Sequence, residues 1–452
     1  MTPLPTSERS VGPRGRMTWL LTLVLAPALA LMLGACDIDE IMQVDLPGDV
    51  TEADLTDPAL AGTLALGVQA DFECGLVDYI WYPGLWFSNF TNSSTSRPNA
   101  LMELRAQLVD VYADPCASGT GPVYGPIMTP RLQAVRATAL INAYETPPSN
   151  KAELLASIAL YQGYSEQLMG ESHCGVVVLD PVAYPDGGPL GTRAAAWERA
   201  AALFGTAIAG GTADIKNAGY VGRARANLNL GNMAAAIADA ALVPEGFQML
   251  ATYSESPYRR VNKISERNIE GTSILPHRDW MGKTIKADGT LTKDDGTADP
   301  RVEIIAGVEF GGRGLIDMRH QQKYLKRNDP IPFATWREAQ LIIAEASQGT
   351  TAVEKINLLR SNSAGLPKNV DSTAWPLTAY AGGTSAAEVT ELVREERRRE
   401  LWYQGVRPGD KIRWAEAFEM TSEYGTALGA GGPLMTSFLE VASNPNVTQK
   451  CP

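Results

Sequence analysis

Apolar residues recur along most of this chain at the spacing of one helix face, and few segments alternate as exposed strands do. The first such stretch runs from Pro58 toward Ile80 and predicts a long helix, because it is rich in alanine and leucine and has no interior proline. Later stretches predict helices in pairs, each divided by a short turn. The four expected pairs are 130–146 with 150–169, 193–211 with 220–244, 333–349 with 351–363, and 386–405 with 410–425.

The second expected pair carries small residues at a spacing typical of tetratricopeptide helices. Leu230 and Gly231 are followed by Ala236, by Ala240 and by a closing Pro244. Small side chains let two helices approach closely, and stacked pairs bury a continuous core. Because the distance between pairs varies, the prediction is a mainly α, tetratricopeptide-like scaffold of helical pairs with insertions.

Two segments interrupt the helical pattern. Proline, glycine and a polar cluster of Asn, Ser and Thr within 81–98 predict a loop from Pro83 onward. The larger interruption, 245–330, is polar and irregular, and short apolar runs within it suggest strands. We therefore expect a helical-pair region at 58–244, an irregular non-repeat subdomain inserted at 245–330, and a second helical-pair region at 331–452.

The composition limits the chemistry open to the chain. Its 452 residues are 45% apolar, which is enough for a large core, and the formal charge of −12 argues against a nucleic acid as the main partner. The three histidines lie far apart in sequence. No G-x-S-x-G, H-E-x-x-H or P-loop motif occurs, so we expect neither an enzyme nor a cofactor. The many carboxylates leave a hydrolase as the alternative.

The N-terminus predicts export. Arg14 and Arg16 precede the uncharged apolar stretch 17–35, which ends in small residues as a signal peptide does; a membrane helix is the alternative. The closing Leu33-Gly34-Ala35-Cys36 resembles a bacterial lipobox, which implies that Cys36 is lipidated and becomes the mature N-terminus. A single lipidated cysteine anchors a protein at a membrane surface, and the protein itself does not span the membrane.

The segments on either side of Cys36 complete this picture. Residues 1–36 form the expected lipoprotein signal peptide, whose start is either Met1 or Met17. The acidic, unpatterned segment 37–57 is expected to be a flexible tether. We identify no second uninterrupted run of about 18 apolar residues, so the remainder is expected to be soluble.

Four further cysteines, Cys74, Cys116, Cys174 and Cys451, predict two disulfides, since an even number is typical of exported chains. Three connectivities are open. Cys74 and Cys174 each precede a glycine near the end of a helical run, and we favour pairing them. None lies in a C-x-x-C spacing, so zinc is not expected.

A charged stretch at 393–414, "VREERRRELWYQGVRPGDKIRW", stands out in an acidic chain. On a helix, Glu396 and Glu400 fall on the apolar side, whereas the three arginines at 397–399 point in three directions and cannot form one basic face. Local ion pairs with the glutamates are available three or four positions away. We therefore expect the arginines to stabilise the fold; binding of a polyanion is the alternative.

The same stretch closely resembles the late segment of SusD/RagB-type lipoproteins, E-R-R-x-E-L-x-x-E-G-x-R-x-x-D-[LI]-R-R-W, with Gln404 in place of the usual glutamate. Three other segments resemble family elements in the same order: "ADPRV" at 298–302, "KYLKRNDPIPFATWREAQLIIAEA" at 323–346, and "EVASNPNVTQKCP" at 440–452. The resemblance implies a surface-exposed lipoprotein of the outer membrane. Such proteins cover a SusC-like, TonB-dependent transporter and capture a glycan, or sometimes a peptide, without chemistry of their own.

The resemblance also points to regions that would bind a ligand. Sugar rings stack on aromatic rings, while Asn, Asp, Gln and Arg side chains bind the hydroxyls. The regions implied here are 81–98 and 253–283, and each residue has a plainer alternative as a core or turn residue. A peptide-binding member of the same uptake system and a tetratricopeptide-type interaction scaffold remain alternatives. The candidate ligand residues are Trp81, Trp86, Asn89, Asn92, Arg97, Tyr258, Arg259 and Trp280.

Overall fold

The structure is a computed structural model, and it describes residues 54–106, 116, 124–180, 182–311, 314–422, 426–448 and 451. Cys36, the expected signal peptide and almost all of the expected tether lie outside this part of the chain. The described residues from Thr56 onward form one compact unit. The finer division of the chain at 244 and 330 stays a prediction.

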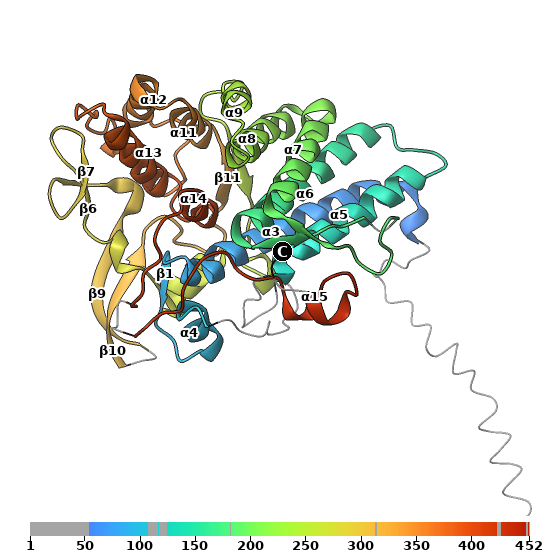
Figure 1. The fold of residues 1–452 in the computed structure, drawn as a ribbon, viewed down its shortest axis with the longest axis horizontal. Helices are drawn as coiled ribbons and strands as arrows, with labels where there is room; N and C mark the ends of the chain where they lie inside the picture. Colours follow the sequence, from blue (N-terminus) through green and yellow to red (C-terminus); the bar gives the residue numbers. More distant parts are fainter. Residues whose placement is uncertain are drawn as a thin grey trace, which may run out of the picture. The chain divides into compact units, whose positions relative to one another are not determined.

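The compact unit is mainly α-helical (Figure 1). The principal helices are α3 (Ala61–Trp86), α4 (Arg97–Glu103), α5 (Gly125–Ala143), α6 (Lys151–Ser172), α7 (Arg193–Gly210), α8 (Ala213–Asn229), α9 (Met233–Ala240), α11 (Trp336–Ser347), α12 (Gly349–Ser361), α13 (Ala386–Glu400), α14 (Arg407–Arg413) and α15 (Phe438–Ser443). Single turns are η1 (Asp54–Thr56), η2 (Pro58–Leu60), η3 (Tyr258–Arg260), α10 (Lys263–Ser265), η4 (Glu266–Glu270), η5 (Arg278–Trp280), η6 (Pro300–Val302) and η7 (Ser372–Ala374).

Successive helices pack as neighbours, which confirms the expected helical-pair scaffold. α5 packs on α6, α6 on α7, α7 on α8, and α8 on α9, and the series continues through α11 to α12 and α13. One expected helix, 220–244, is in fact two: α8 ends at Asn229 and α9 starts at Met233. Gly231 lies between them with a φ of +79°, a conformation that glycine adopts without steric cost.

Close approach of helices depends on glycine at one position on α8. A Cβ built on Gly222 would lie 2.4 Å from the ring of Phe204 on α7, far inside van der Waals contact. The ring of Phe204 is fully buried and packs edge-on to Tyr164 of α6, 4.9 Å between centroids. Gly222 therefore sets the distance between α7 and α8.

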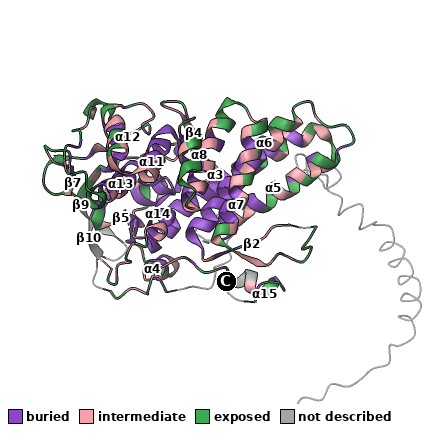
Figure 2. Ribbon diagram, turned by 45° about the horizontal axis from the view of Figure 1, so that its top comes forward, coloured by how far each residue is buried: buried purple, intermediate pink, exposed green. Residues whose placement is uncertain are grey.

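The central helix, α3, continues past the point where the sequence predicts a loop. Pro83 lies inside it, and the helix ends only when the amide of Phe87 donates to the carbonyl of Pro83. Although we identify no second uninterrupted apolar run in the sequence, the segment Pro58–Trp86 could cross a membrane by length and composition. Its second half is buried against α5 and α6, as a core helix is (Figure 2).

Short antiparallel strand pairs occur between the helices, and most of their strands lie within 245–335. β1 (Phe90–Asn92) pairs with β5 (Ile274–Pro276), β2 (Gly175–Val177) with β3 (Leu190–Thr192), and β4 (Gln248–Ala251) with β11 (Ile331–Thr335). β6 (Lys283–Ile285) lies between β7 (Leu291–Lys293) and β8 (Thr297–Ala298). β9 (Ile304–Gly311) and β10 (Gly314–Gln321) form the longest pair among the described residues, within the segment where short apolar runs suggest strands.

Two disulfides are present, as the cysteine count predicts, but the favoured pairing of Cys74 with Cys174 is wrong. Cys74 is bonded to Cys116, and Cys174 to Cys451. Cys74 lies in the middle of α3 because that helix runs on to Trp86. Cys174 follows α6, where its amide donates to the carbonyl of Leu434, so the C-terminal segment lies beside it.

The charged stretch at 393–414 folds as α13 and α14, and its arginines serve the fold as predicted. Arg397 binds Asp410, with Nε and Nη2 3.1 and 3.0 Å from the carboxylate oxygens, and Arg399 donates to the carbonyls of Thr284 and Thr292. Arg398 points elsewhere, toward Trp280, with Cζ 5.7 Å from the ring centre. The three side chains thus leave the helix in three directions.

The buried glutamates of α13 find partners far away in sequence, not among the neighbouring arginines. Glu396 accepts from Arg301 of η6 (2.5 Å) and from Nε of Arg360 of α12 (2.7 Å). Glu400 accepts from Nη2 of Arg337 of α11 (3.1 Å). Because an unpaired buried charge is costly, these pairs fix α11, α12 and η6 to one helix.

Candidate functional site

The two regions proposed from the sequence as ligand-binding lie side by side. β1 and β5 pair with Phe90 opposite Pro276 and Asn92 opposite Ile274. One residue beyond the pair, the amide of His277 donates to the carbonyl of Asn89. The regions 81–98 and 253–283 are therefore joined by backbone hydrogen bonds, although neither the pairing nor its register is visible in the sequence.

Two of the proposed tryptophans are core residues, which corrects the expectation for them. Trp81 has 0% exposed surface, donates from Nε1 to Asp78 at 2.9 Å, and lies under the guanidinium of Arg267, 4.0 Å from its ring centre. Trp86 is 7% exposed and donates to the carbonyl of Gly432 at 2.8 Å. Both lie on the extended end of α3, so neither presents an open ring face to a ligand.

The polar residues of the first region have separate roles. The side chain of Asn92 is bound within its own turn, where Oδ1 accepts from the amide of Ser94 at 3.0 Å, so this residue makes a turn. Asn89 is buried and lines a small cavity described below. Arg97 is exposed at the start of α4.

Tyr258 and Arg259 lie beside the buried cluster around Trp81. Lys263 binds both oxygens of Asp78 at 2.8 Å, and its Nζ lies 5.7 Å from the ring centre of Tyr258. Burial raises the pKa of Tyr258 to about 12, so its hydroxyl is neutral at physiological pH. Arg259 is exposed and forms an ion pair with Asp71 of α3. These two residues flank the core cluster instead of joining Trp280.

Trp280, by contrast, lines a hollow. Only 2% of its surface is exposed, and it packs on Trp402 with ring centres 5.6 Å apart. Trp402 stacks on Tyr403 at 4.1 Å, and Tyr403 on Phe90 of β1 at 4.3 Å. A row of aromatic rings thus runs from β1, past the residues after α13, to the end of η5.

The hollow beside Trp280 has a volume of about 470 Å³, and we name it the Trp280 hollow. This size lies within the range of small-ligand pockets. Lys283, at one side, binds Glu395 at 2.9 Å, and burial lowers the pKa of its ammonium group. Glu303 and Asp371 are exposed carboxylates at the rim. The residues that line it include Trp280, Lys283, Thr284, Pro300, Glu303 and Asp371.

Sequence reasoning missed both rim carboxylates. Glu303 follows directly on "ADPRV", one of the segments that resembles family elements, so a signal lay next to it. Asp371 belongs to the segment between α12 and α13, where it caps η7 by accepting from the amide of Thr373 at 2.9 Å. Its hydrogen bonds with Thr373 lower the pKa of Asp371. No pattern in the sequence connects this residue with Trp280.

A second hollow, of about 570 Å³, lies between α13 and the β6–β7 turn. Tyr380 lines it, and its hydroxyl donates to the carbonyl of Gly383 at 2.8 Å. Most of the remaining polar lining is acidic, so we name it the acidic hollow. Its carboxylates are Asp288, Glu388, Glu391 and Glu395.

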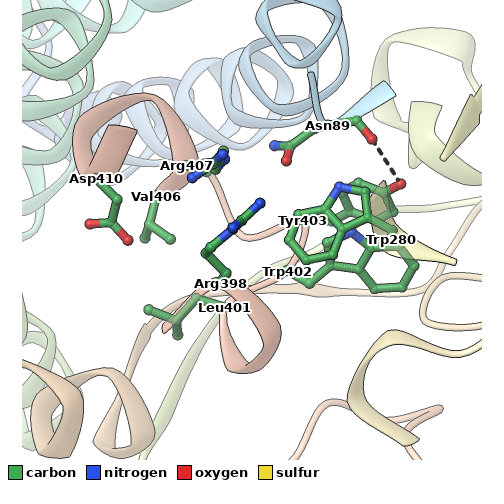
Figure 3. Close-up of a pocket in the computed structure, with 10 residues that line it drawn as sticks. Asn89, Trp280, Arg398, Leu401, Trp402, Tyr403, Val406, Arg407 and Asp410 are labelled. Carbon is green, nitrogen blue, oxygen red and sulfur yellow. Dashed lines mark hydrogen bonds between the residues drawn. The ribbon is translucent and has the colours of Figure 1, made fainter. Parts of the chain in front are cut away.

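A third, much smaller cavity is also lined by Trp280, and we name it the Arg398–Arg407 cavity (Figure 3). Its volume is about 10 Å³, the space of one water-sized sphere. Several buried side-chain N–H groups along its wall have no acceptor among the described residues. Each such group costs about 1–3 kcal/mol when it stays unpaired.

A metal site is not supported where ligand-type residues gather. Cys74, Asp78 and Cys116 have ligand atoms within 4.8 Å of one another. Both sulfurs are in a disulfide, and Asp78 is bound by Lys263 and Trp81. These residues therefore offer no thiolate and no free carboxylate to an ion.

Comparison with known proteins places this arrangement among relatives. Residues 338–432 match the model of the SusD family, and the match spans most of α11 and all of α12, α13 and α14. No curated protein sequence matches the chain.

Solved structures extend the likeness to most of the chain. A SusD-like protein from Bacteroides fragilis is 12% identical, with a TM-score of 0.61 and coverage of 89% of this chain and 98% of that chain. A SusD superfamily protein from Parabacteroides distasonis is 12% identical, with a TM-score of 0.62 and coverage of 86% and 98%. A SusD-like carbohydrate binding protein from Bacteroides fragilis is 14% identical, with a TM-score of 0.54 and coverage of 74% and 80%.

At these identities the solved structures show a shared fold, and the matched segment adds the family signature. That segment contains Glu396 and Glu400, which organise the buried ion pairs. The resemblance drawn from the sequence is thereby confirmed. The chain is therefore similar to the SusD family over residues 338–432, and it shares the fold of SusD-like proteins over most of its length.

Proposed function

We propose that this protein is a nutrient-binding SusD-type lipoprotein that captures a glycan and passes it to a SusC-like, TonB-dependent transporter. The match of residues 338–432 to the SusD family model supports nutrient binding, and one structural relative is described as a carbohydrate binding protein. The observation that carries the proposal is the Trp280 hollow, where an aromatic ring and two exposed carboxylates face one space of about 470 Å³.

The chemistry of the hollow suits a sugar. Carboxylates accept hydrogen bonds from hydroxyl groups, and charge-assisted hydrogen bonds are the stronger kind. Glu303 and Asp371 supply such acceptors at the rim, and Trp280 supplies an apolar part of the wall. Lys283 keeps its ammonium on Glu395, so it offers less to a ligand. We assign recognition to these residues and no catalytic step to any of them.

Location and partner complete the proposal. Cys36 would carry the lipid that holds the protein at the outer membrane, and the acidic segment 37–57 would tether the compact unit to it. Replacing Cys36 with serine should release the protein from the membrane fraction. Continued sedimentation of Cys36→Ser with outer membranes in cells that lack the transporter would contradict lipid anchoring.

Binding is tested with rim substitutions that leave the core intact. Glu303→Gln and Asp371→Asn remove one charge each from exposed positions, whereas Trp280→Ala would remove a buried ring and damage the fold. We expect each rim variant to bind a glycan identified in a binding screen with about tenfold lower affinity than the parent, since a hydrogen bond to a charged group contributes about 1.5–3 kcal/mol. Glu153→Gln, exposed on α6, is the matched control.

The outcome separates the alternatives. If both rim variants bind such a glycan with the affinity of the parent, the glycan does not bind in the Trp280 hollow. Absence of any glycan hit, with binding of peptides, would move the assignment to a peptide-capturing member of the same uptake system.

One observation favours that peptide alternative. Four carboxylates line about 570 Å³ of space in the acidic hollow, and three of them remain beside Glu395, which Lys283 already binds. Such a lining suits a cationic peptide better than a neutral sugar. The double variant Glu388→Gln, Glu391→Gln changes two exposed residues of this hollow. Weaker binding of a lysine- or arginine-rich peptide by this variant alone, with the rim variants unaffected, would establish the peptide alternative.

A further inference from the structure

The Arg398–Arg407 cavity is surrounded by hydrogen-bond donors from three separate parts of the chain. Figure 3 shows the guanidinium ends of Arg398 and Arg407 turned toward each other, with the indoles of Trp280 and Trp402 on one side and Asn89 above. A hydrogen bond from the Tyr403 hydroxyl to the Asn89 carbonyl, 3.4 Å, holds the wall together. The cavity thus lies where the end of α3, η5 and the α13–α14 turn meet.

Four buried N–H groups of these side chains have no acceptor anywhere in the described part of the chain. They are Nε1 of Trp280, Nε1 of Trp402, Nε of Arg398 and Nε of Arg407. Three of the four side chains are more than nine-tenths buried: Trp280 and Trp402 are each 2% exposed, and Arg407 is 8% exposed. Water from outside therefore has little access to these donors, and an internal acceptor is needed.

The charges of the wall favour an anion as that acceptor. Burial, followed by the nearby charge of Arg398, lowers the pKa of Arg407, as expected for two like charges close together in a dry site. The neighbouring carboxylates are engaged at other atoms: Glu395 lies 3.3 Å from Nη1 of Arg398, and Glu416 lies 2.7 Å from Nη1 of Arg407. Asp410 lines the cavity, but it is bound by Arg397 and Arg413.

The size of the cavity and the number of donors distinguish an anion from water. A water molecule accepts about two hydrogen bonds and donates two, so it would leave about half of the four donors unpaired. A monatomic anion accepts from all four and offsets the repulsion of the two guanidinium groups. About 10 Å³ admits one water-sized sphere, whereas sulfate or phosphate is larger.

We propose that the Arg398–Arg407 cavity is a structural binding site for a small monovalent anion of the chloride class. The anion accepts hydrogen bonds from Arg398, Arg407, Trp280 and Trp402. Asn89 also lines the cavity, and its buried Oδ1 has no donor among the described residues. Turning its amide, whose orientation is assigned from the surrounding network, would exchange Oδ1 for Nδ2 and supply a fifth donor. This site is independent of the Trp280 hollow, although Trp280 lines both.

Bromide, which replaces chloride and scatters anomalously, provides the direct test. In crystals of the purified chain grown with sodium bromide, we expect one anomalous peak within hydrogen-bonding reach of the Nε atoms of Arg398 and Arg407. Absence of a peak at this position, in crystals that bind bromide elsewhere or not at all, would overturn the proposal in favour of a water molecule.

Thermal unfolding provides the solution test. At constant ionic strength, exchange of sodium methanesulfonate for sodium chloride should raise Tm by about 2 °C in a saturable way, because the anion binds only the folded chain. The rise should disappear in Trp402→Phe, which keeps the ring and removes one N–H. The matched variant Trp375→Phe removes an indole N–H that donates to Leu359 outside the cavity, and should keep the rise.

Each result decides the question. Equal Tm values of the parent in the two salts would refute a structural anion, and an anomalous peak with equal Tm values would show binding at crystal concentration only. Arg407→Gln, if folded, should lose both the peak and the Tm rise; if it retains either, Arg407 is not a ligand. Glycan binding is measured separately, so failure of this site leaves the proposed function intact.

Discussion

Replacement of Glu396 by glutamine tests whether the arginines around α13 hold the fold together. The side chain of Glu396 has 0% exposed surface and binds two guanidinium groups, those of Arg301 and Arg360. Glutamine keeps the shape, but it removes the charge and turns an N–H toward a guanidinium donor. Removing one partner of a buried ion pair costs about 3–5 kcal/mol, so we expect the free energy of unfolding to fall by that amount.

The same helix offers a matched control in Glu391→Gln. The side chain of Glu391 is 71% exposed and lies 3.9 Å from Arg394, so its pairing contributes less than about 1 kcal/mol. Both variants make the same chemical change on α13. The contrast between them isolates burial from the loss of one negative charge.

Equilibrium unfolding in urea, followed by far-UV circular dichroism, measures both variants against the parent. At unchanged m values, the midpoint of Glu396→Gln should shift strongly and that of Glu391→Gln hardly at all. If the two variants differ by less than about 1 kcal/mol, the buried pairs contribute no more than surface pairs do, and the structural role of this network is refuted.

Three further expectations concern packing, pH and the disulfides. Gly222→Ala should lower the free energy of unfolding by about 1–3 kcal/mol, because the new methyl group would meet the buried ring of Phe204 at 2.4 Å. The control Gly205→Ala, where the nearest atom lies at 3.8 Å, should raise the free energy of unfolding by about 0.5–1 kcal/mol. Equal effects of the two variants in urea unfolding would contradict the close packing of α7 and α8. Burial lowers the pKa of His173 to about 3, so the unfolded chain takes up the proton at a higher pH than the folded chain. The free energy of unfolding should be fully retained above about pH 6.5 and fall by up to about 5 kcal/mol toward pH 3. His173→Phe should lose this part of the pH dependence when unfolding is measured across this pH range, and an equal decline in parent and variant would refute the prediction. Cys174→Ser opens a link between residues 277 positions apart and should lower the free energy of unfolding by about 2–5 kcal/mol, with no further loss from this link on reduction; an unchanged midpoint would contradict the bond to Cys451.

Helical periodicity predicted the scaffold because each amphipathic helix records in its own sequence which face it buries. Its boundaries were less readable. Pro83 lies within the last turn of α3, where the missing N–H is offset by the surrounding core, so the helix reaches Trp86. From the sequence, Gly231 is interpreted as a small residue that lets two helices approach. In the structure, Gly231 has a φ of +79° and lies where one helix ends.

The candidate site was harder to predict because it depends on contacts between distant segments. Trp81 and Trp86 were proposed from their place near a polar loop, but the longer helix places both in the core. Trp280 and Asp371 meet through folding across about 90 residues of chain. The pairing of Cys174 with Cys451 has the same origin, since nothing near either cysteine in sequence identifies its partner.

The buried ion pairs of α13 bear on how this protein is divided in the laboratory. The segment 338–432 that carries the family match holds Glu396 and Glu400, but two of their partners, Arg301 and Arg337, lie upstream of it. Expressed alone, that segment would keep two buried carboxylates and lose two of the three arginines that pair with them. The most recognisable part of the sequence is thus not an autonomous folding unit, and excised pieces should begin no later than the start of α3.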